Sequence, residues 1–453
     1  MPIDPETRAK AQQAYANASP KQPPKPDKNA SLDPVECRSW FLLVTAWRKA
    51  LKWTPGLDRA LSVMLASITS TKSVGDQLWV RIISPPASGK STLCEALSVN
   101  RKYVVAKSTI RGFHSGFKTD RDGEEDNSLL SQLYGKTLIT KDGDTLLQAP
   151  NKSQILAEAR DVYDGTSRTH YRNKMSKDYQ GARLTWILCG TNSLRQLDSS
   201  ELGERFLDCV IMESIDEDLE DEILWRVANR TESNMSLESD GKAETQYDPE
   251  LAQAMQLTGG YVGWLRENAK GQLSQVTASE AALRECIALG KFVAFMRARP
   301  SERQGETAER EFASRLTSQM IRLAKCLAVV LNREAVDDEV LDRVRQVALD
   351  TARGRVLSLV RVLHKNGIKG LQARALAICT GEGEDSERGL LKFLRKIGVV
   401  ESFAPQKRIG VSSSPRWRLT PRLVRLYNRI INEQENNDAE SGESTNGDGE
   451  ADA

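Results

Sequence analysis

The spacing of hydrophobic residues changes several times along the chain, and each change marks a different kind of element. Between residues 33 and 71 they recur at helical spacing, which predicts about two helices. Apolar runs of strand length follow at residues 78–83, 103–106, 137–140, 184–189 and 207–212. The segments between them predict helices at 92–97, 154–163 and 201–206 and an irregular polar insertion at 109–127. Strands that alternate with helices predict an α/β fold with a mostly parallel, doubly wound sheet that binds ligands at its carboxyl edge.

Beyond residue 217 the pattern is helical as far as 350, and the strongest amphipathic runs are 281–298 and 315–332. We expect an all-helical domain packed beside the site of the α/β domain. Residues 353–431 predict three helices and then two short strands, which is the order of a winged helix. Ser386 is expected to cap the third of these helices, at 387–397, and Gly398 to end it.

The two ends of the chain have biased compositions. Residues 1–30 are rich in Pro, Lys, Ala and Gln, which predicts a disordered arm. From Glu433 onward there are eight acidic residues and no Lys or Arg, so the net charge of +2 combines a tail of −8 with a remainder of +10. A basic body suits a polyanionic partner, and the tail either competes with nucleic acid or only aids solubility. The predicted divisions are 1–30, 31–75, 76–216, 217–350, 351–431 and 432–453.

The overall composition is that of a globular protein with 39% hydrophobic and 28% charged residues. Apolar runs stay well short of the roughly 20 residues that cross a bilayer, and no signal-peptide core opens the chain, so we expect a cytoplasmic protein with no membrane partner. The seven cysteines stand singly, and this spacing indicates reduced core thiols.

The clearest chemical motif is Ser84-Pro-Pro-Ala-Ser-Gly-Lys-Ser91, which stands between a predicted strand and a predicted helix. Such a loop directs backbone N–H groups toward a phosphate, here from residues Ala87, Ser88, Gly89, Lys90, Ser91 and Thr92. Lys90 would bind the β and γ phosphates and the Ser91 hydroxyl would bind Mg²⁺. Ser84 occupies the place of the usual first glycine of this motif. The alternative is an ordinary Gly-Lys-Ser turn.

A phosphate loop needs an acidic partner for Mg²⁺, and Asp142 follows the third predicted strand. The alternative for Asp142 is a residue that opens the Asp-Gly turn. Many ATPases place a water-orienting Glu directly after this Asp, whereas here the position is Gly143. Asp144 is the nearest acid, and we expect it to act as the catalytic base.

Two further polar residues follow from strand positions. Asn192, after the fourth strand, can position the attacking water or contact the γ-phosphate, or it can be a simple turn former. Arg205, directly before the fifth strand, can project into a neighbouring subunit's site, or it can be a surface residue at a helix end.

Taken together, these motifs resemble an AAA+ ATPase, and more specifically the ATP-binding proteins of phages and mobile elements. The segments that carry the likeness lie within about residues 60–215 and include 75–80, 134–142, 160–165 and 202–206. The resemblance implies ATP and Mg²⁺ as cofactors and a helical lid over residues 217–350. It also implies self-association into a ring, expected to be a hexamer, with Arg205 acting in trans.

A looser resemblance is to MCM-type helicases, which carry a DNA-directed hairpin where this chain has residues 167–177. The candidate DNA contacts there are Arg168, His170, Tyr171, Arg172, Lys174 and Lys177, and the alternative is a solvated loop. By the same likeness Arg315 would contact the γ-phosphate, with Arg266 as the competing candidate. The predicted winged helix adds the basic residues Arg388, Lys392, Arg395, Lys396, Lys407, Arg408, Arg416 and Arg418, although winged helices also bind proteins.

These observations lead us to expect an ATP-driven, ring-forming, helicase-like motor or remodeller that acts on DNA in phage or mobile-element replication. The alternative is a DNA-bound nucleotide switch, an initiator or regulator with slow or no hydrolysis. Gly143 is the residue that motivates this alternative.

Overall fold

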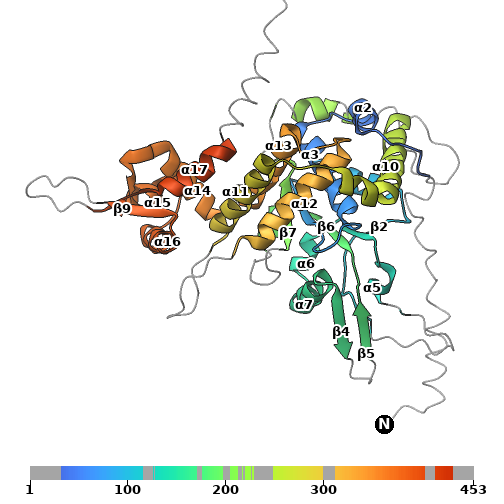
Figure 1. Cartoon of the computed structure of the whole chain (residues 1–453), viewed down its shortest axis with the longest axis horizontal. Coiled ribbons are helices and arrows are strands. Elements are labelled where there is room, and N and C mark those ends of the chain that lie inside the picture. Colours follow the sequence, from blue (N-terminus) through green and yellow to red (C-terminus); the bar gives the residue numbers. More distant parts are fainter. Residues whose placement is uncertain are drawn as a thin grey trace, which may run out of the picture.

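The computed structural model describes residues 32–115, 126, 128–170, 176–196, 205–212, 217, 220–225, 227–228, 248–298, 312–352, 354–403 and 414–431. The predicted arm at 1–30 and the acidic tail at 432–453 lie outside these ranges. Figure 1 shows the central sheet with helices on both sides, a projecting hairpin and a C-terminal segment at one side.

The fold is α/β, built on a five-stranded parallel sheet with the order β2-β3-β6-β1-β7. All five predicted strands are confirmed, as β1 (Trp79–Ile83), β2 (Val104–Lys107), β3 (Thr137–Thr140), β6 (Thr185–Gly190) and β7 (Phe206–Val210). The prediction of a helix at 201–206 is wrong for Phe206, which is the first residue of β7 and pairs with Trp79. Residues 201–204 lie outside the described residues.

Each central strand sends alternate side chains into two hydrophobic cores, as a sheet covered on both faces requires. On one face Trp79, Trp186 and Phe206 form an aromatic cluster with ring centroids 5.3–5.4 Å apart. The short helices α5 (Leu129–Gln132) and α6 (Asp144–Leu147), the longer α7 (Lys152–Tyr163) and the 3-10 turn η1 (Asn192–Gln196) cover this face. On the other face Val80, Ile82 and Ile187 belong to the larger core, in which β1 and β6 contact α3 (Pro55–Ser70).

Two N-terminal helices, α2 (Trp40–Ala50) and α3 (Pro55–Ser70), confirm the prediction for residues 33–71. The Ser39 side chain caps α2, and Thr54 caps α3 directly before Pro55 in the first turn. Nearly every residue of α3 is buried, because the helix lies between the sheet and the helices that follow.

The helical region consists of α10 (Pro249–Gln275), α11 (Glu280–Met296), α12 (Ser314–Val330) and α13 (Asp338–Thr351). Both predicted amphipathic runs are helices. α12 packs on α3 and α11, and α13 packs on β7, so one continuous core joins these helices to the sheet.

A separate antiparallel hairpin is formed by β4 (Thr166–His170) and β5 (Ser176–Gln180). Figure 1 shows it extending away from the central sheet. The predicted hairpin is therefore present, and the residues 171–175 that join its strands lie outside the described residues.

The C-terminal segment contains α14 (Arg355–Asn366), the turn η2 (Gly367–Lys369), β8 (Leu371–Gln372), α15 (Ala373–Thr380), α16 (Glu384–Lys396), β9 (Val400–Phe403), β10 (Arg416–Leu419) and α17 (Pro421–Ile431). The three predicted helices and two predicted strands are present. The strands β8, β10 and β9 form one antiparallel sheet. The unpredicted α17 packs on α11, where the rings of Phe292 and Tyr427 stack 5.9 Å apart.

The prediction that Ser386 caps the third helix is wrong. α16 begins at Glu384 after Gly383, and Ser386 lies in its first turn. There its hydroxyl accepts a hydrogen bond from Arg355 at 2.7 Å, and the same guanidinium forms a 2.6 Å ion pair with the fully buried Glu387. Acidic residues in a first turn interact favourably with the helix dipole, and this helix has three of them.

No helix among the described residues is both long and apolar enough to span a bilayer. Six of the seven cysteines are buried, and Cys379 is exposed.

Buried charges join β7 to its neighbours. Arg81 of β1 forms a two-point ion pair with Asp208 of β7, at 2.6 and 2.9 Å. Asp208 and Val210 also donate backbone hydrogen bonds to Thr351 and Asp350, at the end of α13. The position of α13 therefore depends on polar contacts inside the core.

We predict that Asp208→Asn lowers the free energy of unfolding by about 3–5 kcal/mol, because it leaves the Arg81 guanidinium buried without its counter-charge. Urea denaturation measures the change. The double variant Arg81→Met, Asp208→Leu removes both charges and should recover most of the loss. A single variant as stable as the wild type would contradict this account of the pair.

Burial raises the pKa of Asp350 from 3.8 to about 7, against the opposing effect of the nearby Arg59. Between about pH 4 and 7 the unfolded chain gives up this proton while the folded chain keeps it. The contribution of Asp350 therefore makes the fold less stable as pH rises through this window. We predict that Asp350→Asn removes this loss, so that the urea midpoints of variant and wild type diverge as pH rises. Parallel pH profiles would contradict the assignment.

Candidate nucleotide-binding site

The loop at 84–89 joins the carboxyl end of β1 to α4 (Lys90–Ser98), as the motif predicted. Its path requires two left-handed residues, Ala87 with φ 61° and Gly89 with φ 88°. Gly89 is the cap residue of α4, and a glycine adopts this conformation without steric cost. Ala87 is strained there, which is a feature found at ligand-binding loops.

The backbone of the loop offers a group of N–H donors. None of the N–H groups of residues 87–92 donates a hydrogen bond to a described residue. They lie at the N-terminus of α4, where the helix dipole favours an anion. The arrangement can therefore bind a phosphate group.

The Lys90 side chain folds back onto the loop. Its ammonium donates to the carbonyl oxygens of Ser84 and Pro85, each at 2.7 Å, and to the Ser84 hydroxyl at 2.8 Å. Burial lowers the pKa of Lys90. Bound phosphate oxygens could replace these neutral acceptors and would interact more strongly with the ammonium.

Ser84 is nearly completely buried, and its hydroxyl also forms a hydrogen bond with the Ser88 hydroxyl. A glycine at this position has no hydroxyl, so it could form neither the hydrogen bond with Ser88 nor the one between the hydroxyl and Lys90. The departure from the usual motif therefore supplies two contacts that hold the loop.

Two acidic residues of the β3–α6 turn share this edge of the sheet. Asp142 is exposed toward the pocket, whereas both carboxylate oxygens of Asp144 are engaged. One accepts from the Thr191 backbone at 2.9 Å, and the other accepts from the Ser193 hydroxyl at 3.0 Å. Asp144 thus joins the ends of β3 and β6.

Gly143 has no space for a side chain. Its backbone N–H donates to the Cys189 carbonyl at 2.7 Å. A Cβ added to Gly143 would lie 2.6 Å from Leu188 Cδ1 and 2.9 Å from that carbonyl oxygen. The glutamate that many ATPases carry at this position could not be accommodated unless β3 and β6 moved apart.

These groups line a cavity of about 540 Å³, within the range of small-molecule sites. The loop, Lys141, Asp142, Asp144 and Thr191 form its polar lining. The apolar residues of the lining include Ala50, Leu51, Leu57, Met212, Ile223 and Val227. A 2.5 Å ion pair between Lys52 and Glu222 joins two segments that contribute to the apolar lining. The cavity suits a ligand with a flat apolar part and an anionic part.

The structure brings together most of the residues predicted for nucleotide binding, namely Ala87, Ser88, Gly89, Lys90, Ser91, Thr92, Asp142 and Asp144. No three His, Cys, Asp or Glu side chains gather as a metal site among the described residues. Mg²⁺ is often bound by only a few protein ligands together with the phosphates of a nucleotide. Ser91 and Asp142 fit such a site.

Asn192 is exposed and does not line the cavity, whereas the adjacent Thr191 does. The sequence analysis also missed Lys141 and the apolar lining. Lys141 directly precedes Asp142 and could have been found from that position. The apolar lining is formed by segments far apart in the sequence, and no local pattern joins them.

Arg205 does not project outward in this single chain, and its predicted role in a neighbouring subunit's site stays a prediction. Only 10% of its side chain is exposed, and it forms a 3.1 Å ion pair with Asp164 and lies over the Tyr163 ring. The reason is its position before β7, at the amino edge of the sheet, where α7 ends.

The predicted γ-phosphate contacts of the helical region are wrong. Arg315 lies near Tyr163, and Arg266 donates to the carbonyls of Ile68 and Gly135. These partners lie toward the amino edge of the sheet, opposite the phosphate loop. No described residue of α10–α13 lines the cavity. The helical region packs on α3 instead of beside the cavity, because α12 buries its apolar face there.

The candidate DNA contacts of the hairpin have mixed positions. Arg168 and His170 are exposed, and Arg168 pairs with Asp178 across the hairpin at 2.9 Å. Lys177 is largely buried against Asp126 and Ser128, so its predicted outward contact is wrong. Tyr171, Arg172 and Lys174 lie outside the described residues.

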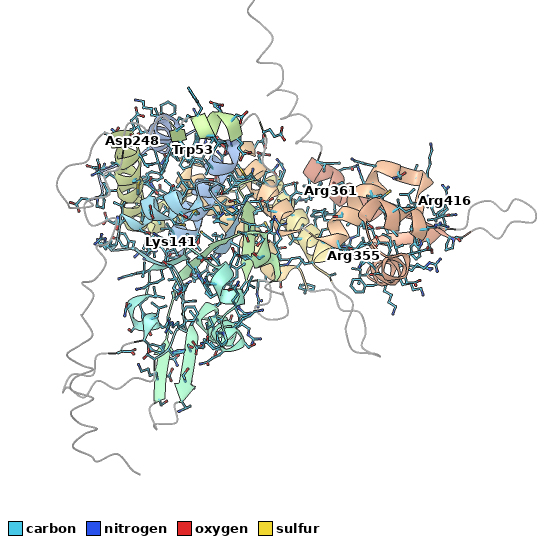
Figure 2. The ribbon with its side chains drawn as sticks, turned by 180° about the vertical axis from the view of Figure 1, so that it is seen from behind. Trp53, Lys141, Asp248, Arg355, Arg361 and Arg416 are labelled. Carbon is cyan, nitrogen blue, oxygen red and sulfur yellow. The ribbon has the colours of Figure 1, made fainter. Side chains whose placement is uncertain are left out.

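In the C-terminal segment, Arg388, Lys392 and Arg395 are exposed on α16. Arg388 pairs with Glu384 at 2.6 Å, and Arg416 donates to the Lys369 carbonyl at 2.9 Å. Lys407 and Arg408 lie outside the described residues. Lys141 of the cavity and Arg416 lie on opposite sides of the molecule in Figure 2.

No protein-family model matches the chain, and no curated protein is detectably similar to it in sequence.

We predict that Gly143→Ala lowers the thermal midpoint and weakens nucleotide binding, because its Cβ would force β3 and β6 apart. Differential scanning calorimetry and titration with a fluorescent ATP analogue measure the two effects. Gly271→Ala is a control for loss of a glycine, since a Cβ there meets no atom within 4 Å and the residue has no left-handed φ. If Gly143→Ala binds the analogue like the wild type, the close approach is not required for the site.

Proposed function

We propose that this chain binds ATP with Mg²⁺ and acts on DNA as an AAA+-type protein. The observation that carries the proposal is the cavity at the carboxyl edge of the sheet. There, Lys90, Asp142 and loop N–H groups that donate to no described residue share one space with apolar side chains.

Each part of the cavity has a role in this proposal. The N–H groups of residues 87–92 bind the phosphates, and Lys90 moves from the loop carbonyls to the β and γ phosphates. Ser91 and Asp142 hold the Mg²⁺ shell. Leu51, Leu57 and Ile223 contact the base. The sheet order supports this assignment, because β6 lies between β1 and β3 and places both loops at one edge.

The C-terminal segment supports the DNA part of the proposal. Helices α14, α15 and α16 and the three-stranded antiparallel sheet of this segment follow the order of a winged helix, with α16 as the recognition helix. Lys392 and Arg395 are exposed on that helix and could contact phosphates.

A ring-forming motor needs a catalytic base and an arginine supplied in trans. In this proposal Asp144 is the base and Arg205 the trans residue, and both would have to leave their present partners. Asp144 would release Thr191 or Ser193, and Arg205 would release Asp164.

The second candidate, a DNA-bound nucleotide switch, is favoured by one specific observation. The close contact at Gly143 leaves no space for a water-orienting glutamate, so hydrolysis would be slow. Binding of ATP would then act through the shape of the loop and not through repeated turnover.

We predict that Lys90→Ala loses most of its affinity for a fluorescent ATP analogue, because the phosphates lose their only lysine from the loop. The matched control is Lys365→Ala, which removes an exposed lysine that does not line the cavity. Equal affinity of Lys90→Ala and wild type would refute nucleotide binding at this site.

ATP turnover measured with and without DNA, together with the mass of the assembly in ATP, separates the two candidates. The motor is supported if a ring hydrolyses ATP faster with DNA and the Asp144→Asn substitution abolishes this turnover. ATP-dependent DNA binding with negligible turnover supports the switch.

A further inference from the structure

A second and larger cavity, of about 810 Å³, lies at the opposite end of the sheet from the phosphate loop. It is bounded by residues 72–74, which lead into β1, and by parts of α10, α11, α12 and α17. α11 and α17 are in contact, so this cavity lies where the helical region meets the C-terminal segment.

The charge around this cavity has one sign. None of the residues that line it is acidic. Six of them are cationic, namely Lys72, Lys270, Lys291, Arg322, Lys325 and Arg422. None of the six forms an ion pair with a carboxylate of the described residues. Arg322 donates to the Ser73 hydroxyl at 2.6 Å and to the Val74 carbonyl at 2.8 Å, both neutral acceptors. Mutual repulsion among these cations favours a bound polyanion.

The floor of the cavity is apolar. Leu273, Ile321 and Cys326 contribute to it, and the Phe312 side chain at its margin is 79% exposed. An exposed aromatic ring beside lysines can stack a base while the lysines bind the adjoining phosphates. A purely ionic ligand would leave this apolar surface uncovered.

We propose that this cavity binds single-stranded nucleic acid, with an unstacked base against Phe312 and its backbone phosphates on the surrounding cations. Duplex DNA fits less well, because its bases are paired and stacked inside the helix and cannot reach the floor. The acidic segment 433–453 matches the charge, but alanine is its only apolar residue, so it cannot cover the floor. The inference rests on the DNA part of the proposed function and names the form of nucleic acid recognised.

The test compares the affinities of the full chain for fluorescein-labelled oligo(dT) and for a labelled duplex, measured by anisotropy over a range of salt concentrations. Lys291→Gln with Lys325→Gln should weaken oligo(dT) binding about tenfold. It should also reduce the slope of log affinity against log salt by about 1.4, because about 0.7 is lost for each single-strand phosphate contact. Duplex affinity should stay within about twofold of the wild type.

Phe312→Ala should weaken oligo(dT) binding by about tenfold without changing the salt slope, because stacking releases no counterions. The charge-matched control is Lys49→Gln with Lys365→Gln, which removes two exposed lysines outside the cavity and should behave like the wild type. Phe312 is exposed, so its replacement should not unfold the chain.

Three outcomes would overturn the inference. In the first, the cavity variants bind oligo(dT) like the control. In the second, they lose oligo(dT) and duplex binding equally, which indicates a general charge effect. In the third, a peptide of residues 433–453 binds the wild-type cavity more tightly than oligo(dT). If the wild type binds neither form of DNA, the DNA part of the proposed function fails as well. If the wild type binds DNA and the cavity variants bind it with the same affinity, only this inference fails.

Discussion

The close packing of β3 against β6 at the carboxyl edge of the sheet is the constraint on which the candidate site depends. The Gly143 N–H donates to the Cys189 carbonyl, and the next residue, Asp144, accepts a hydrogen bond from the Thr191 backbone N–H. This contact holds Asp142 and Thr191 around the same space as the loop that leaves β1. The same packing of β3 against β6 excludes a side chain at position 143. It therefore removes the usual place for a water-orienting acid.

The opposite edge of the sheet has a different chemistry. Arg205 pairs there with Asp164 and the Tyr163 ring, Arg266 donates to carbonyls, and Arg322 of α12 donates to the Ser73 hydroxyl in the segment before β1. A ligand in the basic cavity would contact residues 72–74, which lie a few residues before β1, and ATP would contact the loop directly after β1. β1 is thus a short, fully buried connection between the two cavities.

Much of the fold was predictable because the five sheet strands are local apolar runs and the helices have clear periodicity. The loop motif also predicted its own strand and helix, and Asp142 followed from its position after β3. The errors concern contacts made at long range. Nothing near Arg205 indicates that it packs on Tyr163, and nothing near Arg315 indicates that α12 directs it to the amino edge. The start of α16 was missed because the buried pair of Glu387 with Arg355 joins segments 32 residues apart.

The central claim is that the loop at 84–91 binds the phosphates of ATP through its backbone. Hydrogen–deuterium exchange of the full chain, with and without Mg²⁺ and ATP, tests this claim at the N–H groups themselves. The account predicts strong protection of residues 87–92 on addition of nucleotide, and smaller protection of the segment around Asp142. Unchanged exchange of residues 87–92 at saturating ATP would contradict it.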